Sequence, residues 1–128
     1  IESVNSSTIL IAVTILTSFS KENMANLGIS DLDKHILNLG KLAYDCGLDG
    51  VVCASTDTQS IKKNFGENFL AVTPGIRPAW SSLDDQRRVS TPAEALRNGS
   101  DFLVIGRPIT GSKDPIKALE RIYKEMDE

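Results

Sequence analysis

Two segments in the second half of the chain each end an apolar run in glycine, proline and arginine. The first is FLAVTPGIRP, from Phe69 to Pro78, and the second is DFLVIGRPIT, from Asp101 to Thr110. An arginine held where a buried strand ends can bind an anion through two parallel hydrogen bonds. The sequence therefore predicts that Arg77 and Arg107 form an anion site, and it favours a phosphate group as the anion.

Further polar residues follow the same strand ends and extend this prediction. Gly106 would let the backbone N–H groups approach an anion closely, because it has no side chain. Gln86 can donate from its amide if the long segment after Pro74 folds over the site. Thr17 and Ser18 offer hydroxyl groups after the first apolar run, where they fit a ligand contact or an ordinary turn equally well.

Structural roles compete with these assignments. An arbitrary arginine more often caps a helix or pairs at the surface, but the position of Arg77 and Arg107 beside Gly and Pro at strand ends favours the anion site. Gln86 alone is a weak signal. His35 is remote from every strand end, so we expect it to be solvated and not catalytic, and Trp80 fits a hydrophobic latch or a partner contact.

Strands buried in a parallel sheet would position these residues. Four short apolar runs are near-continuous instead of alternating, a pattern typical of strands buried on both faces of a parallel sheet. These runs are Thr8–Thr14, Leu48–Ala54, Phe69–Thr73 and Asp101–Ile105. Parallel strands place their carboxyl ends at one edge of the sheet, so the candidate residues are expected to converge there.

Helices are predicted between the apolar runs. Apolar residues recur every three or four positions over Asp31–Cys46, which places them on one helix face. The TPAE segment Thr91–Glu94 has the pattern of a capping box with proline at the first helical position, and Asp114 before Pro115 repeats the cap and proline. The alternation of strands and helices predicts an α/β fold, with a long and unusual loop over Pro74–Ser90.

Composition restricts the class of protein. The 128 residues are 41% hydrophobic, as expected for one globular domain, and a net charge of −3 argues against a broad basic surface for nucleic acid or membranes. Cys46 and Cys53 lie in apolar surroundings without CxxC spacing, and the chain has one histidine, so no disulfide or zinc site is expected. The lack of a long apolar run or signal-peptide pattern predicts a cytoplasmic protein.

Five ordered blocks of the sequence carry a specific resemblance. These are LIAVTILTS, GLDGVVCAS, FLAVTPGIRP, DQRRVSTP and DFLVIGRPIT. In order and spacing they closely resemble the carboxyl-terminal half of bacterial orotidine 5'-phosphate decarboxylase, from about Ile9 to the final predicted helix. The resemblance implies a (β/α)8 TIM barrel in which this chain supplies approximately strands five to eight. Residues 1–128 would then be the carboxyl-terminal half of a single domain.

The resemblance also implies an activity. Members of that family are homodimers that convert orotidine 5'-phosphate to uridine 5'-phosphate and carbon dioxide in pyrimidine biosynthesis, without a cofactor or metal. Thr17 resembles the family's threonine near the pyrimidine, and Arg77 and Gln86 resemble residues of its phosphate-gripping loop. Gly106 and Arg107 resemble its principal phosphate site. The expected ligand is therefore a nucleotide, with no role for nucleic acid or membranes.

The family's catalytic constellation of lysines and aspartates has no counterpart here. It belongs to the amino-terminal strands, and no DxKxxD block occurs in these 128 residues. We therefore expect no catalytic residue in this chain, an inactive isolated fragment, and an amino-terminal half of the barrel as its partner. A full barrel needs about 250 residues, and an arc of four strands would expose two sheet edges and an apolar inner face.

Two alternatives remain from the sequence. Another phosphate-binding barrel, such as a decarboxylase acting on a keto-sugar phosphate, would share the phosphate half. A preference for binding pyrimidine nucleotides over sugar phosphates would favour orotidine 5'-phosphate decarboxylase over that enzyme. A half-barrel that binds ligands or assembles without catalysis is the other alternative, and turnover on adding the amino-terminal half would exclude it.

Overall fold

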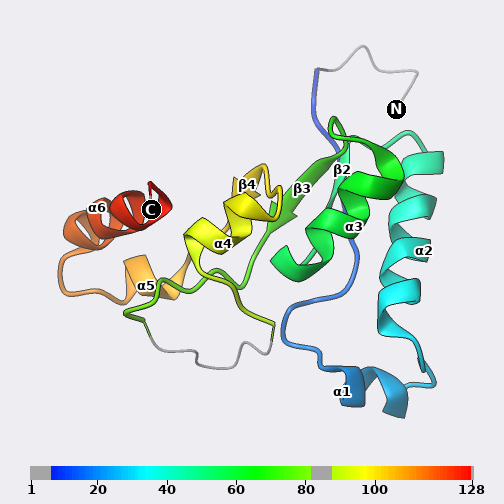
Figure 1. The fold of residues 1–128 in the computed structure, drawn as a ribbon, viewed down its shortest axis with the longest axis horizontal. Helices are drawn as coiled ribbons and strands as arrows, with labels where there is room; N and C mark the ends of the chain where they lie inside the picture. The colour runs from blue at the N-terminus through cyan, green and yellow to red at the C-terminus, as the bar shows by residue number, and fades with distance from the viewer. Residues whose placement is uncertain (1–6, 82–87, 128) are drawn as a thin grey trace.

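A four-stranded parallel sheet with helices between its strands forms the fold (Figure 1). The computed structural model describes residues 7–81 and 88–127. The strands lie in the order β1-β2-β3-β4 and are β1 (Ile11–Val13), β2 (Gly50–Val52), β3 (Leu70–Thr73) and β4 (Phe102–Leu103). The helices are α1 (Lys21–Asn26), α2 (Leu32–Asp45), α3 (Ser55–Phe65), α4 (Pro92–Arg97), α5 (Arg107–Thr110) and α6 (Pro115–Met126).

The predicted alternation is confirmed, and each strand is shorter than the apolar run that contains it. The helix predicted over Asp31–Cys46 is α2, which begins after Asp31 and ends before Cys46. The predicted caps also form. Thr91 and Glu94 make a reciprocal capping box at α4, and the Asp114 side chain accepts a hydrogen bond from the backbone at the start of α6.

One face of the sheet is buried under helices. The parallel register aligns Ala12 with Val51 and Val51 with Ala71, so these side chains point to the same side. The buried core on that side includes residues from α1, α2, α3 and the strands: Met24, Leu32, Ile36, Ala43, Val51, Cys53, Ile61, Phe69 and Ala71. Burial of this apolar surface fixes α2 and α3 against the sheet.

The opposite face is open, which corrects the prediction of strands buried on both faces. Val13, Val52, Val72 and Phe102 align in register across the sheet, and Val13 is 56% and Phe102 55% exposed. A near-continuous apolar run indicates that both faces of a strand are apolar. It does not indicate whether another layer of structure covers the second face. The structure therefore presents an apolar sheet face to solvent.

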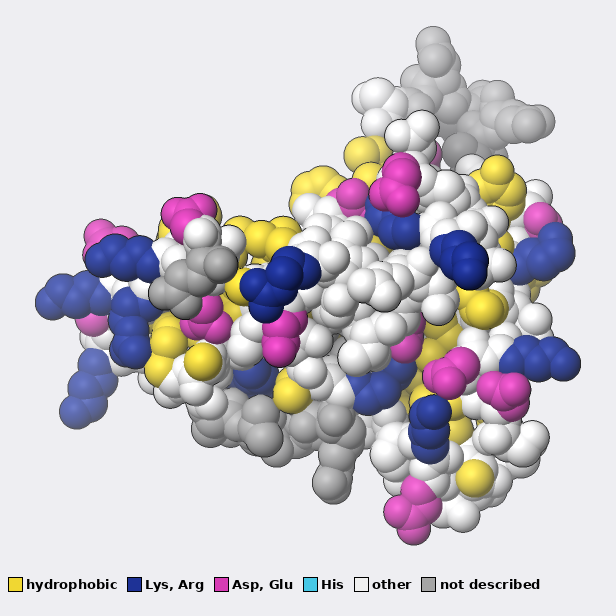
Figure 2. All heavy atoms as spheres, in the orientation of Figure 1, with side chains coloured by type: hydrophobic (Ala, Val, Ile, Leu, Met, Phe, Trp, Pro, Cys, Tyr) yellow, Lys and Arg dark blue, Asp and Glu magenta, His cyan; other side chains and the backbone are white. Residues whose placement is uncertain are grey.

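Charges on the surface are mixed. In the view of Figure 2, the basic side chains in dark blue and the acidic side chains in magenta are interspersed, including at the end formed by α6. This agrees with the small net charge of the sequence. Within the described residues, no helix combines the length and apolar character that crossing a bilayer requires.

Candidate functional site

The segments that follow β1, β3 and β4 emerge at the same edge of the sheet, because the strands are parallel. Thr17 lies four residues beyond the end of β1 and Arg77 four residues beyond β3. After β4, Gly106 is the N-cap of the short helix α5 and Arg107 is its first residue. The predicted convergence at the carboxyl ends of the strands is therefore found for the loops that carry these residues.

A pocket of about 230 Å³ lies between the loops after β3 and β4. Its lining residues are Pro74, Gly75, Ile76, Arg77, Val104, Gly106 and Arg107. Of the two arginines that line the pocket, Arg77 is buried and Arg107 is exposed. Two guanidinium groups beside a glycine backbone are suited to holding a multiply charged oxyanion.

Gly106 contributes open space to this pocket. Its φ of −103° is accessible to any residue, and a Cβ built on it would meet no atom within 4 Å. The carbonyl oxygen of Gly106 accepts hydrogen bonds from the backbone N–H groups of Ile109 at 2.9 Å and Thr110 at 3.1 Å, which close the α5 turn. The φ of Gly106 therefore does not require glycine. The absence of a side chain leaves its backbone accessible from the pocket.

Gly75 connects the pocket to Thr17. Its φ is +74°, and a Cβ at this position would lie 3.1 Å from both Oγ1 of Thr17 and the carbonyl oxygen of Arg88. A side chain at Gly75 would therefore be strained and crowded. Thr17 is buried and does not line the pocket, but it packs directly behind the Gly75 turn.

The two ends of the long loop are tied together and to other elements. Ile76 and Ser90 form a parallel bridge, and the backbone N–H of Arg77 donates to the carbonyl of Ser90 at 2.9 Å. Trp80 lies against α6, where the guanidinium of Arg121 is 4.2 Å from the centre of its ring. This contact with the last helix does not test whether Trp80 acts as a latch or as a partner contact, and both stay predictions. Gln86 lies outside the described residues.

Other candidates take no part in the pocket. His35 is half-buried on α2, and Ser18 is exposed beside Thr17. The described residues contain no cluster of His, Cys, Asp and Glu that could hold a metal ion. The expectation that both cysteines lie in apolar surroundings is wrong for Cys46, which is exposed at the end of α2, whereas Cys53 is buried.

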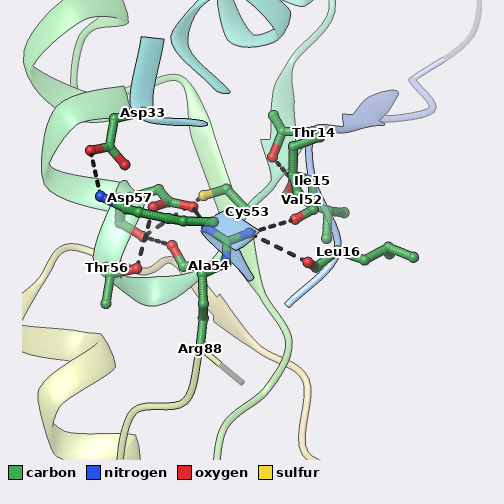
Figure 3. A network of polar contacts seen from close by, with 12 residues as sticks. Thr14, Ile15, Leu16, Asp33, Val52, Cys53, Ala54, Thr56, Asp57 and Arg88 are labelled. Carbon is green, nitrogen blue, oxygen red and sulfur yellow. Dashed lines mark hydrogen bonds and ion pairs between the residues drawn. The ribbon is translucent and has the colours of Figure 1, made fainter. Parts of the chain in front are cut away.

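Arg88 is the polar residue that the sequence analysis missed (Figure 3). Its guanidinium donates to Oδ2 of Asp57 at 2.7 Å and to the carbonyl oxygens of Ile15 at 3.1 Å and Leu16 at 3.4 Å. Its backbone N–H donates to the carbonyl of Thr17 at 3.2 Å. Arg88 is the second arginine of DQRR, and its sequence neighbours give no indication that its side chain is shielded from solvent.

A family model and similar proteins indicate the same family for this chain. The sequence model of the "Orotidine 5'-phosphate decarboxylase / HUMPS family" matches residues 1–122. The chain belongs to this family. The chain is 50% identical over 119 residues to the orotidine 5'-phosphate decarboxylase of Dichelobacter nodosus, covering 92% of this chain and 52% of that protein. With the Chromobacterium violaceum decarboxylase it shares 51% identity over 119 residues, covering 92% and 48%.

Solved structures of this family share the fold. The crystal structure of orotidine 5'-phosphate decarboxylase from Lactobacillus acidophilus superposes with a TM-score of 0.75 at 39% identity, covering 96% of this chain and 51% of that one. The crystal structure of the Pyrococcus horikoshii orotidine 5'-phosphate decarboxylase has a TM-score of 0.64 at 18% identity, covering 94% of this chain and 51% of that one. At this identity the similarity supports the fold alone. These similarities and the parallel sheet support an α/β fold of the (β/α)8 type. The chain spans about half the length of the relatives it matches.

Proposed function

We propose that the complete protein containing this chain decarboxylates orotidine 5'-phosphate to uridine 5'-phosphate in pyrimidine biosynthesis. In this proposal Arg77, Gly106 and Arg107 bind the phosphate, Gln86 reaches it from the long loop, and Thr17 contacts the pyrimidine. The observation that carries the proposal is the pocket that unites the first three residues at the carboxyl ends of β3 and β4, in a chain of this family.

A phosphate site of this kind can promote chemistry at a distant bond. Decarboxylation leaves a developing carbanion on the ring, and the phosphate does not react. Binding energy from the phosphate can nevertheless hold the loop over the substrate and assemble a charged site that excludes water around the reacting carbon. The residues of this chain then bind and orient the substrate, while the proton-donating lysine comes from elsewhere.

The remaining parts of the proposal concern the rest of the barrel. We place β1 to β4 as strands five to eight, and residues 1–128 as the carboxyl-terminal half of one domain. The amino-terminal half supplies the catalytic lysines and aspartates, and the complete barrel forms a homodimer in the cytoplasm that needs no cofactor or metal. The half-length match to relatives and the open apolar face of the sheet support the placement of this chain as one half of a barrel.

The proposed activity can be tested on the complete purified protein. We expect release of carbon dioxide from orotidine 5'-phosphate with uridine 5'-phosphate as the product. Keto-sugar phosphates should bind more weakly than the pyrimidine nucleotide and should not be decarboxylated. Turnover of a keto-sugar phosphate in preference to the nucleotide would support the alternative barrel enzyme and contradict this proposal.

Arg107→Ala gives the first residue-level prediction. Loss of one charge-assisted contact should lower kcat/KM for orotidine 5'-phosphate by about 10- to 100-fold. The variant should leave kcat/KM for orotidine unchanged, since orotidine lacks the phosphate. Arg97→Ala is a matched control, because Arg97 is an exposed arginine at the end of α4 and does not line the pocket. Equal losses for both substrates would refute the phosphate role of Arg107.

A further inference from the structure

Arg88 and Asp57 form an ion pair with little exposure to solvent. The side chains of Arg88 and Asp57 are 14% and 11% exposed, and the N–O distance is 2.7 Å. Asp57 lies in the first turn of α3, whereas Arg88 lies near the end of the long loop Pro74–Ser90. An ion pair removed from water to this extent holds its partners in a fixed geometry, since loss of either leaves an uncompensated charge.

The guanidinium also fixes the chain just before Thr17. It donates to the carbonyl oxygens of Ile15 and Leu16, and the Arg88 backbone N–H donates to the carbonyl of Thr17 itself. Figure 3 shows the Arg88 guanidinium between Asp57 on one side and the carbonyl groups of Ile15 and Leu16 on the other. One residue therefore joins the amino-terminal turn of α3 to the segment that follows β1.

The same residue supports the wall of the pocket. The carbonyl oxygen of Arg88 and Oγ1 of Thr17 both lie 3.1 Å from the position that a Cβ on Gly75 would occupy. Gly75 lines the pocket, but Arg88 and Thr17 do not. Arg88 thus contacts the residues behind the pocket without reaching into it.

We propose that Arg88, held by Asp57, is a positioning residue that fixes Thr17 and the Gly75 turn in the geometry that the substrate requires. This inference rests on the proposed function. A guanidinium suits the task because its planar fork donates to a carboxylate and to backbone carbonyl groups at once. A lysine ammonium can retain the ion pair but cannot reproduce the same set of directed bonds.

The test measures kcat/KM for orotidine 5'-phosphate in the complete protein. Arg88→Ala should lower it by about 10-fold or more, and Arg88→Lys should recover part of the loss. The decisive measurement is a double-mutant cycle with Thr17→Ala. If Arg88 acts through Thr17, adding Arg88→Ala to Thr17→Ala should cost much less than it costs in the wild type. Fully multiplicative losses would overturn the inference.

Asp57→Asn and Asp101→Asn separate positioning from folding. Asp57→Asn keeps an acceptor for Arg88 while removing the charge, so a smaller loss of kcat/KM is expected even if Arg88→Ala fails to fold. Asp101 pairs with Lys62 at the other end of the sheet, away from the pocket. Asp101→Asn should lower thermal stability and leave kcat/KM unchanged, and an equal kinetic loss there would overturn the positioning role.

The outcomes distinguish this inference from the proposed function. If the wild-type protein does not decarboxylate orotidine 5'-phosphate, the proposed function fails and the inference fails with it. If the wild type is active and folded Arg88→Ala retains wild-type kcat/KM, the inference fails alone. Loss in Arg88→Ala, partial recovery in Arg88→Lys and coupling to Thr17 together support it.

Discussion

The two cysteines of the chain lie in opposite environments. Cys46 is exposed after the end of α2, whereas Cys53 follows β2 and is 1% exposed. Burial raises the pKa of the Cys53 thiol from 9.0 to about 11, opposed in part by its contact with the Thr58 hydroxyl. The core therefore favours the neutral thiol, and thiolate chemistry at Cys53 is suppressed near neutral pH.

This pKa predicts a loss of stability in alkaline solution. Because the folded-state pKa is raised, the neutral Cys53 thiol contributes its full stabilisation below pH 9, and that contribution is lost as the pH rises through about 11. The contribution is about 2 kcal/mol. The free energy of unfolding of the complete protein should fall between pH 9 and 11 by this amount relative to Cys53→Ala, which cannot titrate there. An equal change in the free energy of unfolding of the wild type and of Cys53→Ala between pH 9 and 11 would contradict the prediction.

The predicted site residues differ in how far local sequence could locate them. Arg77, Gly106 and Arg107 were found because strand ends, glycine and proline mark them locally, and the structure places them around one pocket. Their role in binding stays a prediction. Arg88 was missed because its partners are remote in sequence: Asp57 is 31 residues away and Ile15 is 73. No local pattern reveals which charge in DQRR will be buried.

At the scale of elements, a second ion pair, between buried Lys62 and partly exposed Asp101, joins α3 to the start of β4. Nζ of Lys62 donates to Oδ2 of Asp101 at 2.7 Å and to the carbonyl oxygens of Glu67 at 2.8 Å and Phe69 at 3.0 Å. The same carboxylate oxygen accepts from the backbone N–H of Ala71 at 2.7 Å. This network lies where β3 and β4 begin, at the edge opposite the pocket.

Breaking this network should destabilise the fold. Asp101→Asn removes the charge opposite Lys62, whose side chain is 6% exposed, so we expect a cost of about 2 to 4 kcal/mol in the free energy of unfolding. Asp45→Asn provides the control, because Lys41 and Asp45 pair on the exposed surface of α2 and should contribute about 0.5 kcal/mol or less. Chemical denaturation measures both. Equal costs for the two variants would show that burial does not strengthen the pair.

Three helices with polar caps were predicted, whereas α1, which begins with a capping box formed by Ser20 and Asn23, and α3 were not. The starts of α2, α4 and α6 carry Asp31, Thr91 and Asp114, each of which accepts a hydrogen bond from the first turn. In contrast, α3 begins after Ala54, which provides no side-chain cap, and its sequence is strongly polar. Packing of Ile61 and Phe65 against the rest of the core stabilises this helix, and packing partners are not visible in a local pattern.

On the scale of the whole molecule, the open sheet face and the segments at its ends expose several apolar side chains. Val13, Leu16, Phe102 and Val104 are each more than half exposed. The edge strands β1 and β4 also present backbone groups that no described strand pairs. Sequence patterning predicted the strands correctly but overestimated their burial, because the pattern reflects apolar character and not the presence of a covering layer.

The isolated chain should therefore associate and lack activity. Residues 1–128 alone are expected to form soluble oligomers or aggregates and to bind a dye that reports exposed apolar surface. Adding the separately produced amino-terminal half should reduce dye binding and restore decarboxylation of orotidine 5'-phosphate. Size-exclusion chromatography and the activity assay measure these changes. Turnover by residues 1–128 alone would contradict the expected absence of catalytic residues.

The order of the strands in the sheet also affects how the chain can fold during synthesis. Each strand pairs with the strand that precedes it in sequence, so the sheet grows at one edge from β1 to β4. A strand leaving the ribosome finds its partner already made, and none has to insert between two strands that are already paired. Pairing with the preceding strand limits each loop closure to a single crossover and favours assembly in the direction of translation.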